Sequence, residues 1–274
     1  MTIAVQQKNS SAVLVNSLVF FLLSYFFVIY LNNLFSIFLA LIMGFDATLY
    51  YYGFDVSGDW TTRSIFTVYL IGPFITLLSG IVFEIFYRKS KEDQSRVKLF
   101  YLWVYIISYT WFFGNMIIGA FFYFGPGVAF ETVQLSMAYR ILIALVALLI
   151  LFFLGYRSTK NIYYTANLYY QELENAARKS FLLNQVLWPV ILGYIFIILY
   201  KAPNIAIFQY FDMYIMAFLF LFVIAMFINV KSITQISFRG DNFKAFINYN
   251  YLVLLVIIIL VLRIGLASGL SFNI

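Results

Sequence analysis

The stretch AVLVNSLVFFLLSYFFVIYLNNLFSIFLALIM, residues 12–43, decides the fold class of this chain. It contains no charged residue. A helix rises 1.5 Å per residue, so about 20 apolar residues cross the roughly 30 Å hydrocarbon core of a bilayer. The run is long enough for one tilted or protruding crossing, but too short for two crossings and a turn. Because the apolar core of a signal peptide spans only about 7 to 15 residues, we predict a retained transmembrane helix here.

The rest of the chain is also apolar. Of its 274 residues, 64% are hydrophobic and 10% are charged, whereas a soluble domain carries about 25% charged residues. Each apolar run should be helical, because the bilayer core offers backbone groups no other hydrogen-bonding partner. We therefore predict an all-α polytopic membrane helix bundle of about seven transmembrane helices, forming a single integral membrane domain over residues 1–274. The predicted spans are 12–43, 64–87, 99–124, 135–156, 184–201, 208–230 and 248–270.

Lysine and arginine residues predict the orientation. Thirteen of the 17 basic residues lie near the N-terminus or in the loops 88–98, 157–183 and 231–247. Because cytoplasmic loops are enriched in Lys and Arg, we expect a cytoplasmic N-terminus and an external C-terminus in a bacterial-type inner membrane. On the external side, residues 45–63 are rich in Tyr and Thr and contain two glycines, which predicts a short re-entrant hairpin.

Two further predictions concern loops and charged residues near the span ends. Residues 158–183 have the pattern of either a helix on the cytoplasmic membrane surface or an extension of the fourth transmembrane helix. Arg140 and Arg263 lie within a turn or two of the external span ends. We expect them to reach lipid headgroups or an acidic neighbour such as Glu131.

The chain has no Cys and no His. Disulfides, thiolate metal sites, cysteine nucleophiles and histidine-based acid–base chemistry are therefore excluded. We expect no enzyme activity and no cofactor. The net charge of +6 is explained by the basic loops, so the expected partners are the lipid bilayer and another membrane protein, and no nucleic acid.

Polar side chains inside the predicted spans are the first candidates for function, because burying them in hydrocarbon costs free energy unless they find a partner. Asn32, Asn33 and Ser36 form the densest group. Asn32 and Ser36 are four residues apart and share a helix face. One interpretation is hydrogen bonding between helices of the same chain. Glu84 lies near the basic end of its span, four residues before Arg88, and the two are expected to pair.

A second interpretation comes from the residues around this group. The stretch LNNLFSIFLALIMGFDATLY, residues 31–50, resembles the His-Glu-x-x-His helix of site-2 protease-like intramembrane metalloproteases, with the glycine and short strand that follow it. In this alignment Asn32 and Ser36 stand where the zinc-binding histidines would be, and Asn33 stands where the general-base glutamate would be. The pair Gly72-Pro73 is similar to the start of the family's next core helix.

The resemblance covers residues 25–85 and implies a protease-like core that has lost its chemistry. Amides bind zinc poorly, and Asn cannot act as a general base near pH 7. The family takes its last metal ligand from an Asp-Gly motif in a third helix, and Asn115 is the nearest polar residue here. The resemblance therefore implies a core that still holds a partner's helix.

These observations predict a non-catalytic integral membrane protein, an accessory or scaffold subunit that binds another membrane protein through a degenerate protease-like core. The residues assigned to this binding are Asn32, Asn33, Ser36, Gly72, Pro73, Glu84 and Asn115. The alternative is a transporter or channel component whose polar pathway is lined by Asn32, Asn33, Asn115 and Glu84. A lipid or glycan enzyme is a third alternative, which the missing His and Cys disfavour.

Overall fold

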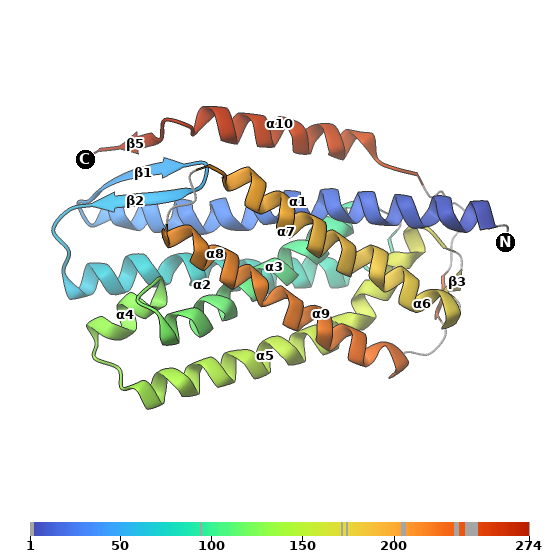
Figure 1. Ribbon diagram of the computed structural model, residues 1–274, viewed down its shortest axis with the longest axis horizontal. Coiled ribbons are helices and arrows are strands. Elements are labelled where there is room, and N and C mark those ends of the chain that lie inside the picture. Colours follow the sequence, from blue (N-terminus) through green and yellow to red (C-terminus); the bar gives the residue numbers. More distant parts are fainter. Residues whose placement is uncertain are drawn as a thin grey trace.

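The computed structural model describes residues 3–93, 95–170, 172–173, 175–203, 207–232, 236–238 and 246–273. These residues form a helix bundle in which the long helix α1 (Ile3–Ile42) begins at one end and the last strand, β5 (Leu270–Phe272), lies at the other (Figure 1). Six helical segments of this part of the chain are long and apolar enough to cross a membrane. They are Ser10–Ile42, Thr62–Ser90, Val97–Phe121, Met137–Leu168, Ala177–Lys201 and Phe211–Ile228.

The spanning helices pack around α3 (Val97–Phe121), which is the most buried of them. Helices α1, α2 (Thr62–Ser90) and α5 (Met137–Tyr164) all contact α3. Further helices are α4 (Pro126–Thr132), α6 (Asn175–Leu182), α7 (Trp188–Lys201), α8 (Ile207–Ala217) and α9 (Leu219–Ile228), with a π-helical turn at Leu183–Leu187 and 3-10 turns at Thr165–Leu168 and Asn229–Ser232. The predicted all-α membrane bundle is confirmed.

The predicted span 248–270 corresponds to helix α10 (Tyr249–Gly265), which has 17 residues and is shorter than the six segments above. It lies along the outside of the bundle beside α1 (Figure 1). Of its side chains, that of Leu255 is buried. A helix of this length extends about 26 Å, close to the thickness of the hydrocarbon core.

Helix α2 shows how local sequence sets a helix boundary. At its start, the Thr61 hydroxyl accepts a hydrogen bond from the Ser64 backbone N–H at 3.2 Å, and the Ser64 hydroxyl accepts one from the Thr61 N–H at 2.8 Å. This reciprocal capping satisfies two backbone donors that have no partner within the helix. At its other end, Arg88 and Lys89 lie in the last turn, where positive charge interacts favourably with the helix dipole.

The predicted hairpin within residues 45–63 is confirmed. Strands β1 (Asp46–Tyr50) and β2 (Gly53–Ser57) pair in antiparallel register, and buried side chains of β1 pack on Ile37 at the end of α1. The structure adds a contact that was not predicted: β5 pairs with the other edge of β1, which gives the strand order β2-β1-β5. The last strand of the chain is thereby joined to its first strand.

The described parts of the predicted basic loops meet at the opposite end of the bundle from the hairpin (Figure 1). One interpretation of residues 158–183, an extension of the fourth transmembrane helix, holds only for their start: α5 continues to Tyr164, and the short helix α6 follows separately. Strand β3 (Glu172–Leu173) pairs with β4 (Ile236–Ser237). The buried Lys98 ammonium donates to the Asp93 carbonyl at 2.7 Å and to the Asn167 side chain. These contacts hold the loops together, and oxygen acceptors satisfy the lysine in its buried position.

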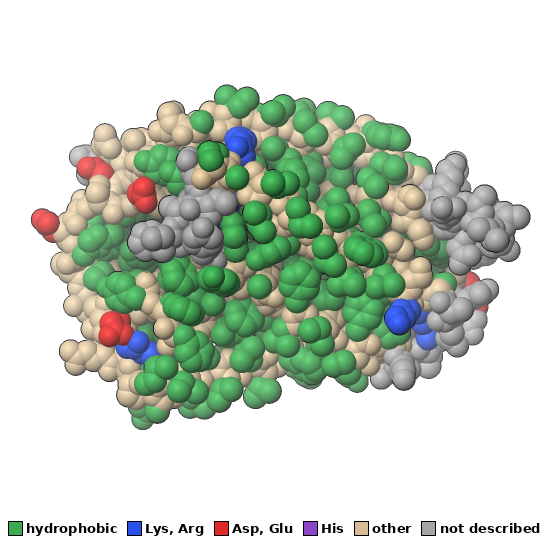
Figure 2. All heavy atoms as spheres, viewed as in Figure 1, with side chains coloured by type: hydrophobic (Ala, Val, Ile, Leu, Met, Phe, Trp, Pro, Cys, Tyr) green, Lys and Arg blue, Asp and Glu red, His purple; other side chains and the backbone are tan. Residues whose placement is uncertain are grey.

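The surface has the distribution expected for a protein surrounded by lipid. Hydrophobic side chains dominate the middle of the face shown in Figure 2, and most Lys, Arg, Asp and Glu side chains visible there lie toward its two ends. Apolar area of this extent is rare on soluble monomers. The surface therefore agrees with the six candidate membrane spans.

Candidate functional site

Asn32, Asn33 and Ser36 lie inside the bundle, where α1 meets α2 and α3. All three are buried. The Asn32 side-chain amide donates to the Asn33 side-chain oxygen at 3.0 Å, and the Trp111 indole N–H donates to the Asn32 oxygen at 3.2 Å. Trp111, which was not predicted, therefore joins α3 to α1 through a buried hydrogen bond.

Gly72 allows α2 to approach this group closely. A Cβ atom at Gly72 would lie 2.6 Å from the Asn32 side-chain oxygen and 2.7 Å from the Ser36 hydroxyl oxygen. No larger residue fits without a shift, so the glycine is required for this helix contact, as small residues are at membrane helix interfaces generally. We call Asn32, Asn33, Ser36, Gly72 and Trp111 the neutral cluster.

Pro73 does not start a helix, contrary to what the resemblance implied. It lies well inside α2, which begins at Thr62, and it is buried beside Gly72. The Thr76 hydroxyl donates to the Pro73 carbonyl at 2.6 Å. Proline is tolerated in membrane helices where neighbouring groups satisfy the backbone.

Asn115 lies one turn from Trp111 on α3. Its side-chain amide donates to the Trp111 carbonyl at 2.8 Å, and its oxygen would lie 3.0 Å from a Cβ placed at Gly125. Asn115 thus faces the turn between α3 and α4. The hydrogen bond to Trp111 places Asn115 near the neutral cluster. Glu84 is far from that cluster, because it lies 12 residues after Gly72, about 18 Å along α2.

Glu84 is the centre of a second group of polar side chains, from α2, α3 and α5. Its Oε1 accepts from Arg88 at 2.6 Å, which confirms the predicted pair, and also from Arg157. Its Oε2 accepts from the Tyr109 hydroxyl at 2.7 Å. Only 8% of the Glu84 side chain is exposed, against 42% for Arg157 and 55% for Arg88. We call these four residues the charged cluster.

The charged cluster is a carboxylate held by donors from three helices. Charge-assisted hydrogen bonds of this kind are stronger than neutral ones, and they offset the cost of removing the carboxylate from water. Two guanidinium groups share one carboxylate, so the formal charge of the cluster is 2 − 1 = +1. The excess positive charge lies on the two exposed side chains.

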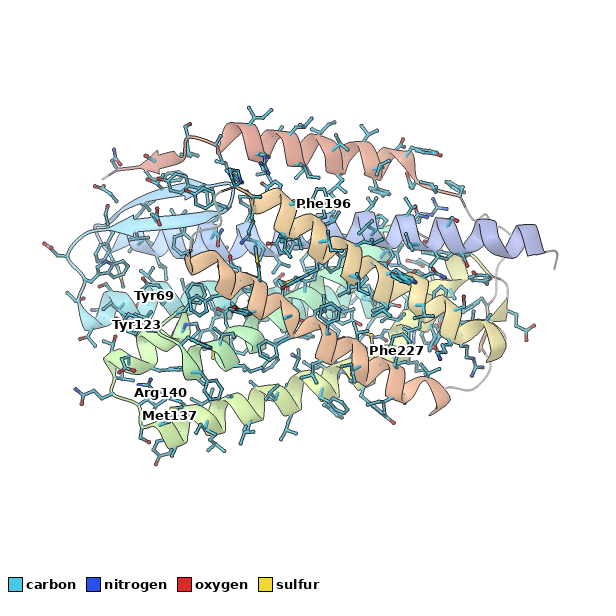
Figure 3. The ribbon with its side chains drawn as sticks, in the orientation of Figure 1. Tyr69, Tyr123, Met137, Arg140, Phe196 and Phe227 are labelled. Carbon is cyan, nitrogen blue, oxygen red and sulfur yellow. The ribbon has the colours of Figure 1, made fainter. Side chains whose placement is uncertain are left out.

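Other ion pairs join Arg140 to Glu131 and Lys201 to Asp212. Arg140 pairs with Glu131 at 2.5 Å, as predicted, and Figure 3 shows Arg140 at the start of α5 at the same end as Tyr69 and Tyr123. The Arg263 guanidinium donates to the backbone carbonyls of Tyr200 and Ala202, and no acidic side chain among the described residues pairs with it. It satisfies carbonyl groups at the end of α7. A contact of Arg263 with lipid headgroups stays a prediction.

Among the described residues, no three His, Cys, Asp or Glu side chains are grouped in a way that could hold a metal ion. No protein family model, curated protein or solved structure matches the chain. The site-2 protease resemblance therefore stays a prediction carried by residues 25–85, and the assignment of a partner or a polar pathway to the predicted residues stays one as well.

Sequence reasoning missed the long-range partners in both clusters. Trp111, Tyr109 and Arg157 lie at least 25 positions along the chain from the residues they bind. A signal existed, because a buried Trp N–H or Tyr hydroxyl needs an acceptor and a carboxylate in a span needs a donor. That rule shows which groups require partners, but it does not pair them.

Proposed function

We propose that the chain is a non-catalytic membrane protein that binds a transmembrane helix of another membrane protein, as an accessory or scaffold subunit. One observation carries the proposal: a row of exposed side chains along the outward face of α5. Its members are Leu142, Leu145, Leu149, Phe153 and Tyr156, which we call the α5 seam. Their spacings of three and four residues are the pattern by which helices interlock side chains.

The opposite face of α5 already packs within the chain. Gly155 approaches α9 so closely that a Cβ there would lie 2.5 Å from the Phe222 carbonyl oxygen. Only 17% of the apolar window of this span is buried inside the protein, against 83% for the span of α3. Helix α5 stands at the edge of the bundle (Figure 1). Since helices associate in lipid chiefly through side-chain packing, a long interlocking seam on an edge helix supports a helical partner.

In this proposal the neutral cluster shapes the bundle and does not touch the partner. Asn32, Ser36 and Gly72 contact one another inside the chain, so a partner helix would meet them only if α2 moved away. The protein acts without catalysis because amides supply neither zinc ligands nor a general base. Its proposed place is a bacterial-type inner membrane, with the basic end of the bundle in the cytoplasm.

The test is site-specific photo-crosslinking in native membranes. A benzophenone amino acid is placed at Leu145 or Leu149 on the seam and, as a matched control, at Val261 on the exposed face of α10. Val261 is 63% exposed and Leu149 is 70% exposed, so the two probes are similarly accessible on the surface of the protein. We expect both seam positions to give one product of the same mass and the control to give none.

Two outcomes would overturn the proposal. Products of the same kind from α10 and α5 would mean random encounters in the membrane. No protein product from either seam position would mean that lipid covers α5. A further check is Leu149→Ala, which removes a side chain from the middle of the seam and should reduce the product formed at Leu145 by at least threefold.

A further inference from the structure

The charged cluster reaches the surface through the partly exposed side chains of Arg88 and Arg157. Arg88 belongs to α2 and Arg157 to α5, and Glu84 pairs with both. A guanidinium carries five N–H donors in a planar fork. Arg88 directs Nε and Nη2 at Glu84, and Arg157 directs Nη2 at it. Within the described residues Glu84 is the only acidic partner of either, so each guanidinium retains donors for a further acceptor.

More charged groups surround this point. The ammonium groups of Lys91 and Lys160 lie 5.3 and 6.0 Å from the centre of the Tyr164 ring, which places the ends of α2 and α5 beside each other. The exposed carboxylates of Glu92 and Asp93 follow in the loop. The side chains named here carry four positive and three negative charges, Glu84 included, and Lys98, whose ammonium donates to the Asp93 carbonyl, adds a fifth positive charge, so they sum to 5 − 3 = +2.

An apolar strip leads away from the two arginines. Ile81 precedes Arg88 by seven residues and Ile150 precedes Arg157 by seven, so each isoleucine lies two turns away on the same helix face. Both isoleucines are exposed, at 43% and 38%. Seven residues correspond to about 10 Å along a helix. Helices α2 and α5, which both pack on α3 and meet at their basic ends, therefore present the same order: a guanidinium toward the basic end and apolar side chains toward the middle of the bundle.

We propose that Arg88 and Arg157 bind the phosphate of an anionic phospholipid whose acyl chains lie over Ile81 and Ile150. Phosphate oxygens fit the guanidinium fork with parallel hydrogen bonds. Glu84 keeps the two guanidinium groups close together, and Tyr109 fixes Glu84 from α3. Basic sites between transmembrane helices bind anionic headgroups by this charge complementarity. The inference does not depend on the proposed protein partner, because the arginines are not members of the α5 seam.

The test measures lipid binding to the purified chain in detergent by native mass spectrometry. Phosphatidylglycerol is compared with phosphatidylcholine, and we expect the anionic lipid to bind at least tenfold more tightly. Arg157→Gln should weaken phosphatidylglycerol binding at least fivefold and leave phosphatidylcholine binding unchanged. The matched control is Lys179→Gln, which removes one positive charge from an exposed site on α6 and should change binding by less than twofold.

A second variant guards against misfolding. Arg88→Gln keeps the ion pair between Arg157 and Glu84, and it should weaken phosphatidylglycerol binding to a similar extent. Equal binding of the two lipids by the unmodified chain would overturn the inference. So would equal losses for Arg157→Gln and Lys179→Gln, which would mean a diffuse charge effect. If soluble glycerol phosphate displaced the lipid at equal concentration, the site would bind phosphate without its acyl chains, and the lipid assignment would be wrong.

Discussion

The neutral cluster and the charged cluster use the same two helices, α2 and α3, and bury polar groups in different ways. Tyr109 and Trp111 are two residues apart on α3, so their side chains point in different directions. Trp111 donates to α1 and Tyr109 donates to α2. In the neutral cluster, amides and an indole bind one another in the interior. In the charged cluster, a buried carboxylate forms ion pairs with two arginines whose side chains are about half exposed.

The exposure of a polar cluster determines whether it can bind a molecule outside the chain. The two hydrogen bonds of the neutral cluster join buried side chains in the interior, so they stabilise the packing of helices. A buried carboxylate requires cations, and long arginine side chains supply them while keeping part of their length at the surface. The charged cluster therefore has donors on half-exposed side chains, whereas the residues of the neutral cluster are buried.

The two ends of the bundle should differ completely in their access to a reagent outside the cell. The chain has no cysteine, so Ser57→Cys in β2 and Ser90→Cys at the end of α2 each introduce a single thiol. In cells, we expect a membrane-impermeant maleimide to label the first thiol and to leave the second unlabelled until the membrane is opened. Labelling of Ser57→Cys only from the cytoplasm would reverse the proposed orientation and strengthen the protease resemblance.

The next effect tests the charged cluster. Glu84→Gln leaves two guanidinium groups without their counter-charge, and breaking a buried ion pair costs about 3 to 5 kcal/mol. We expect about 3 kcal/mol of lost unfolding free energy, at the lower end because both arginines are partly exposed. The matched control is Glu131→Gln, whose carboxylate is 56% exposed, with an expected loss below about 1 kcal/mol. Denaturant unfolding in detergent measures both, and equal losses would contradict the comparison.

The fold was predictable where the signal is local. The predicted span 64–87 became α2, Thr62–Ser90, and the span 99–124 became α3, Val97–Phe121, because the length of an apolar run reports directly on a helix that crosses lipid. The hairpin followed from its Tyr, Thr and Gly residues. The pairing of β5 with β1 was not predictable, since it joins residues more than 200 positions apart and needs the helices to bring both ends together.

The same division applies to the clusters. The pair of Glu84 and Arg88 follows from helix spacing, because residues four apart lie on one face. Arg157 lies 73 residues from Glu84, and only the packing of α2 and α5 against α3 places it there. Asn32 and Ser36 were recognised as sharing a face, but the identity of what meets that face, Gly72 and Trp111, depends on tertiary packing.

A smaller effect tests how tightly the neutral cluster is closed. Gly72→Leu adds a side chain where a Cβ already lies 2.6 Å from the Asn32 oxygen, and overpacking of this kind costs about 1 to 3 kcal/mol. The control is Gly265→Leu at the end of α10, where nothing lies within 4 Å of an added Cβ, so little change is expected. Comparable stability of the two variants would show that α1 and α2 are not held in close contact at Gly72.

The smallest effect concerns the hydrogen bond between Trp111 and Asn32. We expect a double-mutant cycle with Trp111→Phe and Asn32→Leu to give a coupling of about 0.6 kcal/mol, the average for such bonds in membrane proteins, where the unfolded chain also finds partners in lipid. The cycle is needed because each single change also alters packing, which cancels only in the difference. Unfolding in detergent supplies the four free energies.

A coupling above about 2 kcal/mol would mean that the neutral cluster stabilises the bundle as strongly as an ionic one, and the contrast between the clusters would fail. A coupling of zero would leave the close approach at Gly72, and not the hydrogen bond, as the contact that joins α1 to its neighbours. In either case the variant Asn32→Leu should still form the crosslinked product at Leu149, because the α5 seam lies outside the interior that this bond stabilises.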